Sequence, residues 1–284
     1  NLQGTGTTIV RIDPAGQQSL FFQSSEIGLT TALGALQAGF VLVGHLPSPK
    51  GSCKTGPQGQ AQGVSRGSLL VIDGNGTVVG KLTSEALLDG PWDLTINDLG
   101  DSAHVFVSNV LSGTVTRIDL DLQGRKFAVK GMVQIASGYT HRCDPAALVV
   151  GPTGLALDPG TDTLFVSSAG DNAIYAVPNA SSAIVDQGEG SKFINDATHL
   201  HGPLGLARAP NGDLISAQGD AVNPDPNQPS EIVEFDSSGN FISQFPIDPS
   251  AGSAFGLALL AHDSGFAFAA VDDGLNVLDI WVVQ

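Results

Sequence analysis

Short apolar runs separated by turns dominate the hydrophobic pattern of this chain. Runs such as Phe40-Val-Leu-Val-Gly44 and Thr163-Leu-Phe-Val-Ser167 are bounded by Gly, Asp and Ser. Other segments, among them Thr114-Val-Thr-Arg-Ile-Asp119, alternate apolar and polar residues. Both patterns are typical of β-strands, and the alternation predicts strands with one buried face. We therefore expect an all-β protein.

Internal repeats organise these strands. Three segments align without gaps: Gly90-Pro-Trp-Asp-Leu-Thr-Ile-Asn97, Gly151-Pro-Thr-Gly-Leu-Ala-Leu-Asp158 and Gly202-Pro-Leu-Gly-Leu-Ala-Arg-Ala209. Weaker copies begin near residues 28 and 254. Each copy is followed by a second and a third strand, and often by a fourth. A strand-rich repeat of about 50 to 60 residues indicates the blades of a β-propeller.

The strand types are unequal in number. Six segments fit the third strand of a blade, namely residues 8–13, 68–73, 114–119, 173–178, 231–236 and 276–281, but only five segments fit the first strand. Residues 1–27 therefore look like the remnant of a blade. We expect this first blade to be incomplete, with its first two strands upstream of Asn1.

The motifs in residues 151–178 resemble an NHL repeat: Gly-Pro-Thr-Gly-Leu-Ala-Leu-Asp, then Leu-Phe-Val-Ser, then Ala-Ile-Tyr-Ala-Val. Residues 28–284 as a whole resemble the bacterial secreted NHL-repeat β-propellers. The resemblance implies a six-bladed propeller of four-stranded antiparallel blades, in one domain over residues 1–284. Propellers of this type include protein-binding and RNA-binding platforms, a peptide-amidating lyase and more distant lactonase-like hydrolases. The fold alone therefore leaves the function open.

Composition and charge remove several classes of function. The chain has 12 Lys plus Arg against 28 Asp plus Glu, a formal net charge of −16, so it has no basic surface for nucleic acid. Its 42% hydrophobic residues are enough for a core and exclude general disorder. No segment reaches the roughly 18 apolar residues of a membrane span. The partner that fits is a protein, peptide or glycan outside the cell or in the periplasm.

The two cysteines also bear on the cellular compartment in which the protein works. Cys53 and Cys143 both lie in polar loops, where a free thiol would be exposed to oxidation. They form either one disulfide or two unpaired thiols. We favour the disulfide, which would clamp the long loop of residues 47–67 over a neighbouring blade junction and fits a secreted protein.

One face of the propeller should carry the functional site. The loops from the second to the third strand and from the fourth to the next first strand share the face around the axial tunnel. Asp93 replaces the glycine that the repeat has at 154, 205 and 256, and the resemblance makes it the nearest match to the carboxylate that lactonase-like propellers place on a first strand. Trp92 beside it is a core side chain or a ligand platform. The candidate pocket residues are Trp92, Asp93, Asn109, Tyr139, Arg142, Asp171, Asn172, Asp272 and Asp273.

Metal binding is the second chemical possibility on this face. The imidazoles of His199 and His201 point to one side of an extended segment, and His141 or His45 would complete a three-histidine zinc site with an open position. Asp220 and Asp225 begin a run of oxygen donors that suits calcium. The alternatives are histidines bonded to backbone carbonyls and ordinary Asp and Asn turns. Calcium and zinc are thus the candidate cofactors.

Three functions remain open at this point. The first is a rigid scaffold that binds a protein or glycan ligand, because no catalytic motif stands out and no Gly-x-Ser-x-Gly elbow is present. The alternative is a metal-dependent lyase or hydrolase with its site at the tunnel mouth. The third is a subunit of an extracellular assembly, in which another chain fills an unpaired strand edge.

Overall fold

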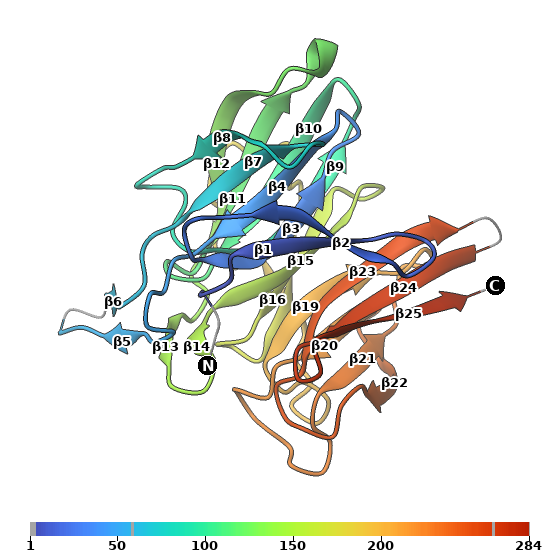
Figure 1. The fold of residues 1–284 in the computed structure, drawn as a ribbon. Helices are drawn as coiled ribbons and strands as arrows, with labels where there is room; N and C mark the ends of the chain where they lie inside the picture. The colour runs from blue at the N-terminus through green and yellow to red at the C-terminus, as the bar shows by residue number, and fades with distance from the viewer. Residues whose placement is uncertain (1–3, 58–59, 263–264, 284) are drawn as a thin grey trace.

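The computed structural model describes residues 4–57, 60–262 and 265–283, which form β-strands and one short 3₁₀ helix, η1 (Gln123–Arg125). Among these residues the strands form five blades around a common axis (Figure 1). The expectation of an all-β propeller is confirmed. No helix in the described part of the chain is long and apolar enough to cross a membrane.

Four of the blades have four antiparallel strands each. Blade 1 consists of β3 (Leu29–Ala35), β4 (Phe40–His45), β7 (Ser68–Asp73) and β8 (Val78–Leu82). Blade 2 consists of β9 (Pro91–Asp98), β10 (Ser102–Asn109), β11 (Thr114–Asp121) and β12 (Ala128–Ser137). Blade 3 consists of β15 (Pro152–Asp158), β16 (Thr163–Ser168), β17 (Ala173–Val177) and β18 (Ser191–Ile194). Blade 4 consists of β19 (Pro203–Arg208), β20 (Leu214–Gln218), β21 (Glu231–Phe235) and β22 (Phe241–Pro246).

The remaining strands form smaller sheets. Blade 5 has three strands, β23 (Ala254–His262), β24 (Gly265–Asp272) and β25 (Val277–Val283). Three two-stranded hairpins stand apart from the blades: β1 (Thr8–Ile12) with β2 (Gln18–Gln23), β5 (Lys54–Thr55) with β6 (Ala61–Gln62), and β13 (Arg142–Asp144) with β14 (Leu148–Val150).

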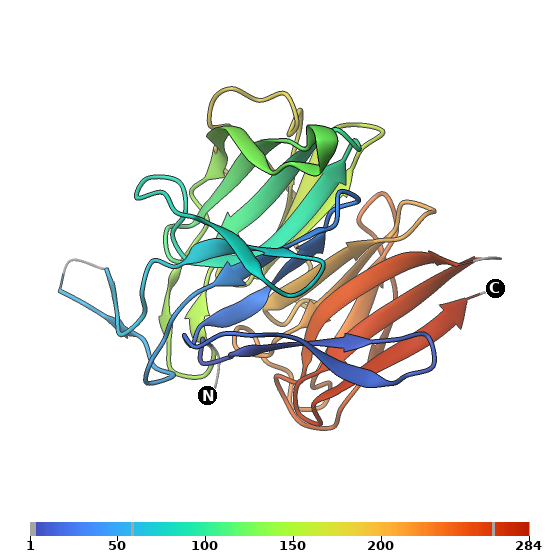
Figure 2. The same cartoon turned by 45° about the horizontal axis from the view of Figure 1, so that its top comes forward.

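The first strands of the blades surround the axis. They pack side by side in the order β3, β9, β15, β19 and β23 (Figure 2). The repeated glycine allows this close approach, because a Cβ on Gly154 would lie 2.3 Å from the Leu204 carbonyl oxygen. A Cβ on Gly205 would lie equally close to the Phe255 carbonyl oxygen. Only a residue without a side chain fits at these two positions.

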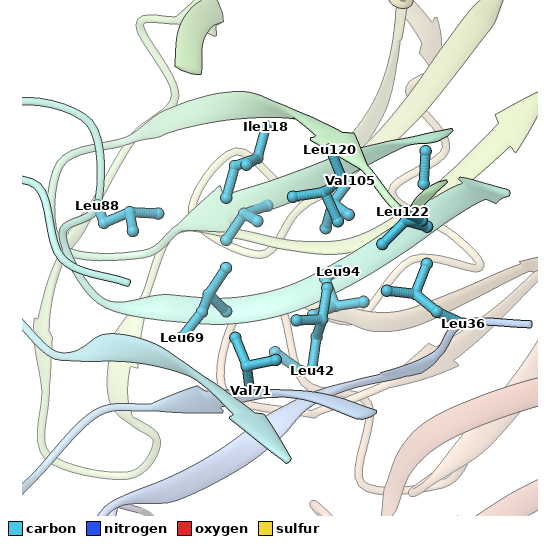
Figure 3. Close-up of a cluster of buried hydrophobic side chains, with 13 residues drawn as sticks. Leu36, Leu42, Leu69, Val71, Leu88, Leu94, Val105, Ile118, Leu120 and Leu122 are labelled. Carbon is cyan, nitrogen blue, oxygen red and sulfur yellow. The ribbon is translucent and has the colours of Figure 1, made fainter. Parts of the chain in front are cut away.

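Apolar side chains fill the spaces between neighbouring blades. Between blades 1 and 2, Leu42 and Val71 meet Val105 and Ile118, and all four are at most 1% exposed (Figure 3). Similar clusters lie between blades 2 and 3, 3 and 4, and 4 and 5. Burial of these side chains, at about 25 cal/mol per Å² of apolar surface, holds the blades together.

The row of blades is open on one side, and the prediction of six blades is wrong for this structure. β23 and β3, at the two ends of the row, do not pack together as the other neighbouring first strands do. The hairpin of β1 and β2 lies between them in both views (Figures 1 and 2). Its Phe22 packs among Val43, Leu70 and Ile72 of blade 1. β1 fits the third-strand pattern, but in the described chain it pairs only with β2, so the hairpin is no blade.

The predicted disulfide is confirmed. Cys53 and Cys143 are bonded, with their Cα atoms 5.2 Å apart. Cys53 lies just before the small hairpin of β5 and β6, and Cys143 lies within β13. The bond therefore ties the long loop of blade 1 to the connection between blades 2 and 3.

Candidate functional site

Two cavities lie along the axis of the propeller. The inner cavity, about 450 Å³, is walled by the first strands β9, β15, β19 and β23 and reaches the open side at Leu33 and Leu278. The outer cavity, about 730 Å³, lies among the connecting loops. Trp92 and Phe255 belong to both walls and contact each other with ring centroids 6.4 Å apart. This aromatic contact between blades 2 and 5 is thus common to the walls of both spaces.

Asp93 is the carboxylate in the wall of the inner cavity. It lies on β9, is half-buried, and has Leu94, Leu155 and Leu206 as fellow wall residues. Its Oδ2 accepts a hydrogen bond from the backbone N–H of Leu155 at 3.1 Å. Burial raises the pKa of Asp93 to about 7, and the backbone hydrogen bonds from Leu94 and Leu155 oppose that shift only partly. Near neutral pH, the protonated and the ionised form of this carboxyl group are therefore both populated.

This state suits proton transfer. A catalytic acid or base works best when its pKa is near the operating pH, and such shifted groups in cavities are concentrated at functional sites. A carboxylate has about four lone-pair positions, so the bond from Leu155 leaves room for a water or ligand proton. The apolar walls would hold an uncharged ligand beside it.

Few other polar side chains reach the inner cavity. Thr95 and Arg208 lie in its wall, and Nη2 of Arg208 lies 3.1 Å from Oδ2 of Asp158. The outer cavity is more polar, with Thr30, Asp220, Asp273 and Asn276 in its wall. Of the candidate pocket residues, Trp92, Asp93 and Asp273 therefore line the axial space.

Three other candidate pocket residues brace the blade junctions instead. Asn109 is fully buried, donates from Nδ2 to the Leu87 carbonyl oxygen and accepts from the Asp89 N–H. Asp171 accepts hydrogen bonds from the Thr140 N–H and the Ser168 hydroxyl. Asn172 donates to the Leu200 carbonyl oxygen and accepts from the Gly202 N–H. Their amides and carboxylate hold connecting loops in place.

The last three candidates also lie outside both cavity walls. Tyr139 is buried between blades 2 and 3, where its hydroxyl donates to the Glu189 carbonyl oxygen, and burial raises its pKa. Arg142 is largely exposed, with Nη2 3.5 Å from Oδ2 of Asp144. Asp272 is 1% exposed and its Oδ1 accepts from the Leu275 N–H.

The candidate histidines bind local partners rather than one another. His45 Nε2 lies 3.0 Å from the Ile27 carbonyl oxygen, and burial, with the charge of Lys81, lowers the pKa of this histidine. His141 Nδ1 lies 3.0 Å from the Tyr139 carbonyl oxygen. His199 pairs with Asp196 at 2.6 Å and stacks on Phe241. His201 Nδ1 lies 2.5 Å from the Asn223 carbonyl oxygen.

The predicted zinc site is thus not assembled. Within the described ranges, no group of three or more His, Cys, Asp or Glu side chains is arranged to hold a metal ion. Asp225 caps a turn, where its Oδ1 accepts from the N–H of Asn227. Asp220 accepts from the Ser230 and Gly252 N–H groups through Oδ2. Asp220 also lies at the wall of the outer cavity, and its N–H donates to the His201 carbonyl oxygen at 2.8 Å.

Sequence reasoning missed two kinds of residue. Phe255 contacts Trp92, and its place before Gly256 of the weakest first-strand copy could have indicated it. Gln228 and Glu231 have buried side-chain oxygens with no hydrogen-bond partner. Glu231 lies in an alternating strand pattern that gave no sign of its burial.

Solved structures with the same architecture define the class of protein. A gluconolactonase from Xanthomonas campestris superposes with a TM-score of 0.58 at 16% identity, covering 94% of this chain and 76% of that one. A luciferin-regenerating enzyme gives 0.55 at 12% identity, covering 95% and 78%. The calcium-binding protein regucalcin from Agrobacterium tumefaciens gives 0.52 at 14% identity, covering 90% and 71%. The chain is a β-propeller of this general kind.

The similarity extends to the fold and no further. No family model matches the sequence, and a search of curated proteins finds no match. At these identities the shared architecture carries no residue roles, because one propeller fold supports many functions.

Proposed function

We propose that this protein is a small-molecule hydrolase whose active site is the inner axial cavity, with Asp93 as the general base. The observation that carries the proposal is a carboxylate whose pKa is raised to about 7 in a cavity where leucine and alanine are the commonest wall residues. The superposed gluconolactonase and luciferin-regenerating enzyme support an enzyme over a binding scaffold.

The proposed reaction is hydrolysis of a cyclic ester. Ionised Asp93 takes a proton from a water molecule as the water oxygen bonds to the carbonyl carbon. The ring carbon–oxygen bond then breaks, and the leaving oxygen receives the proton from Asp93. Lactone and water become a hydroxy acid, and Asp93 returns to its starting state. General base catalysis of this kind contributes about 10²- to 10⁴-fold.

The cavity walls indicate the kind of lactone. Leucine and alanine are the commonest residues of the wall, so an uncharged substrate with an alkyl substituent fits better than a sugar. Arg208, already paired with Asp158, is the cationic group of this wall.

The proposed reaction has no step through a metal. Calcium or zinc at the tunnel would need several ligands, and among the described wall residues of the inner cavity Asp93 is the lone carboxylate. The metal-dependent form of the enzyme hypothesis therefore does not fit these residues.

The remaining proposals concern kinship and compartment. We propose that the repeats are of the NHL type, on the motifs of residues 151–178, and that the protein is secreted or periplasmic. The Cys53–Cys143 disulfide supports an oxidising compartment.

A lactone panel tests the function. The full chain is incubated with neutral lactones of increasing alkyl length, and acid release is followed in a pH-stat at pH 8. We expect turnover that rises with chain length, and a loss of about 10²-fold or more in Asp93→Asn. The asparagine keeps an oxygen that can accept from Leu155.

Asp98→Asn is the matched control. Asp98 lies on the same strand, where its carboxylate accepts from the Gln37 and Gly100 N–H groups. This variant should keep full activity. Absence of turnover across the panel, or an Asp93→Asn protein as active as wild type, would overturn the proposal.

A further inference from the structure

Between the end of β20 and the first residue of β21, four side-chain oxygens are buried without a hydrogen-bond partner. They are Oδ1 of Asp220, Oε1 of Gln228, and both carboxylate oxygens of Glu231. All belong to the loop that joins β20 to β21 and to the first residue of β21. Glu231 is 1% exposed. An ionised carboxylate buried in this way costs several kcal/mol unless another charge or donor offsets it.

The backbone fixes where these oxygens lie. Asp220 has a positive φ of 55°, and its Oδ2 is held by the N–H groups of Ser230 and Gly252 at 2.8 and 2.9 Å. These two hydrogen bonds fix the carboxylate in place, and its other oxygen, Oδ1, has no hydrogen-bond partner. Glu231 is held at the start of β21 by its pairing with Pro246 of β22. The two carboxylates are close enough to interact electrostatically.

His201 does not balance this charge on its own. Its Nδ1 lies 2.5 Å from the Asn223 carbonyl oxygen and so donates to it, while its buried Nε2 has no partner. Glu231 interacts with His201, Asp220 and Asp225. Even a protonated His201 brings one positive charge against the two carboxylates of Asp220 and Glu231. One of the two carboxylates is therefore left without a counter-charge among these residues, and a bound cation would supply it.

We propose that Asp220, Gln228 and Glu231 form a calcium site in the loop between β20 and β21 of blade 4. Two carboxylates and a side-chain amide carbonyl are hard oxygen donors, which calcium accepts in flexible geometry together with backbone carbonyls and water. Zinc prefers nitrogen and sulfur, and magnesium demands a stricter octahedron. Only two of these three ligands are acidic. The proposal therefore agrees with the finding that no group of three or more His, Cys, Asp or Glu side chains in the described chain is arranged to hold a metal ion.

Calcium bound at this site would stabilise the loops around the outer cavity. Asp220 lines the outer cavity, and its Oδ2 already joins this loop to Gly252, ahead of β23. Calcium would thus fix the connection between blades 4 and 5. The inference stands apart from the reaction proposed at Asp93.

Calcium titration of the full chain tests the proposal. Protein treated with EDTA and exchanged into chelator-treated buffer is titrated with calcium chloride in a calorimeter, and its Tm is followed in parallel. We expect one calcium per chain, a rise in Tm, and a much smaller response to magnesium. Glu231→Gln should weaken calcium binding about tenfold or more.

The variants separate binding from folding. Glu231→Gln relieves an unbalanced charge, so in EDTA it should be at least as stable as wild type and yet lack the calcium-dependent rise in Tm. Glu234→Gln is the matched control, because Glu234 lies on the same strand and accepts from the Ser243 hydroxyl instead. It should bind calcium as wild type does. A wild type that gives neither binding heat nor a Tm shift, or Glu231→Gln that binds equally well, would overturn the proposal.

Discussion

Oδ2 of Asp93 and the backbone nitrogen of Leu155 lie 3.1 Å apart, in a hydrogen bond that joins blade 2 to blade 3 at the wall of the inner cavity. In the copies of blades 3 and 4, Gly154 and Gly205 occupy the position of Asp93, and the next strand comes too close for a Cβ. The carboxylate therefore links two blades and also lies in the cavity wall. Substitution by asparagine keeps the acceptor oxygen and removes the proton-transferring group.

Stability should depend on pH through Asp93. Its pKa rises from 3.8 to about 7 on folding, so between these values the folded chain holds a proton that the unfolded chain has lost. This contribution is complete below pH 3.8 and is lost as the pH rises through 7, a change of up to about 4 kcal/mol. In urea unfolding, Asp93→Asn should gain stability over wild type from pH 4 to 7, and the advantage should then stay constant. A variant less stable than wild type at pH 8 would contradict the assignment.

The pH dependence of the activity should follow the ionisation of the same carboxyl group, that of Asp93. With Asp93 as a base, kcat/KM for a lactone should rise tenfold per pH unit below about pH 7 and level off above it. A profile flat from pH 5 to 8 would rule out Asp93 as the titrating base. Asp98→Asn should reproduce the wild-type profile.

The repeated glycines should differ in their tolerance of alanine. A Cβ on Gly154 meets backbone atoms of blade 4 at 2.3 and 2.5 Å, whereas the nearest atom to a Cβ on Gly256 is a Val271 methyl at 3.7 Å. Gly154→Ala should cost about 1–3 kcal/mol of unfolding free energy. Gly256→Ala, at the open side, should be within about 0.5 kcal/mol of wild type. Equal effects in chemical denaturation would contradict the close packing of blades 3 and 4.

The disulfide should stabilise the protein mainly by restricting the unfolded chain. Cys53 and Cys143 are 90 residues apart in sequence, and a loop of that size corresponds to roughly 4–5 kcal/mol. Replacing both cysteines with serine should lower the guanidinium midpoint by a corresponding amount. Wild type in a reducing agent should approach the double variant, while the double variant should not respond. An unchanged midpoint would mean that the unfolded chain is already compact.

Sequence patterns predicted the strands well and their grouping less well. The third-strand segments correspond to β1, β7, β11, β17, β21 and β25. Local alternation specifies a strand, because side-chain direction follows residue parity. It does not specify which sheet the strand joins. β1 has the same pattern as β11, but in the described residues it pairs with β2 alone, so counting third strands gave one blade too many.

The candidate site was predictable where a residue broke the repeat. Asp93 stood out because it replaces a glycine, and it lies in the inner cavity. The histidines could not be placed from spacing, since each loop histidine found a nearby acceptor, such as Asp196 for His199. Glu231 could not be identified because a glutamate is expected at the surface, whereas here it is 1% exposed.

The open side of the ring should determine which part of the molecule unfolds first. A closed propeller gives every blade two neighbours. Here the strands of blade 5 pack along blade 4, and blade 5 also contacts blade 2 through Phe255 and Trp92. Ile280 and Val282 of β25 are exposed. Such a row behaves like a linear array, in which the terminal unit has one interface to lose and the central units have two. Amide hydrogen exchange should therefore be fastest in β25 and slowest in blades 2 and 3. Unfolding would then begin in blade 5 and proceed one blade at a time toward blade 2, which contains Asp93.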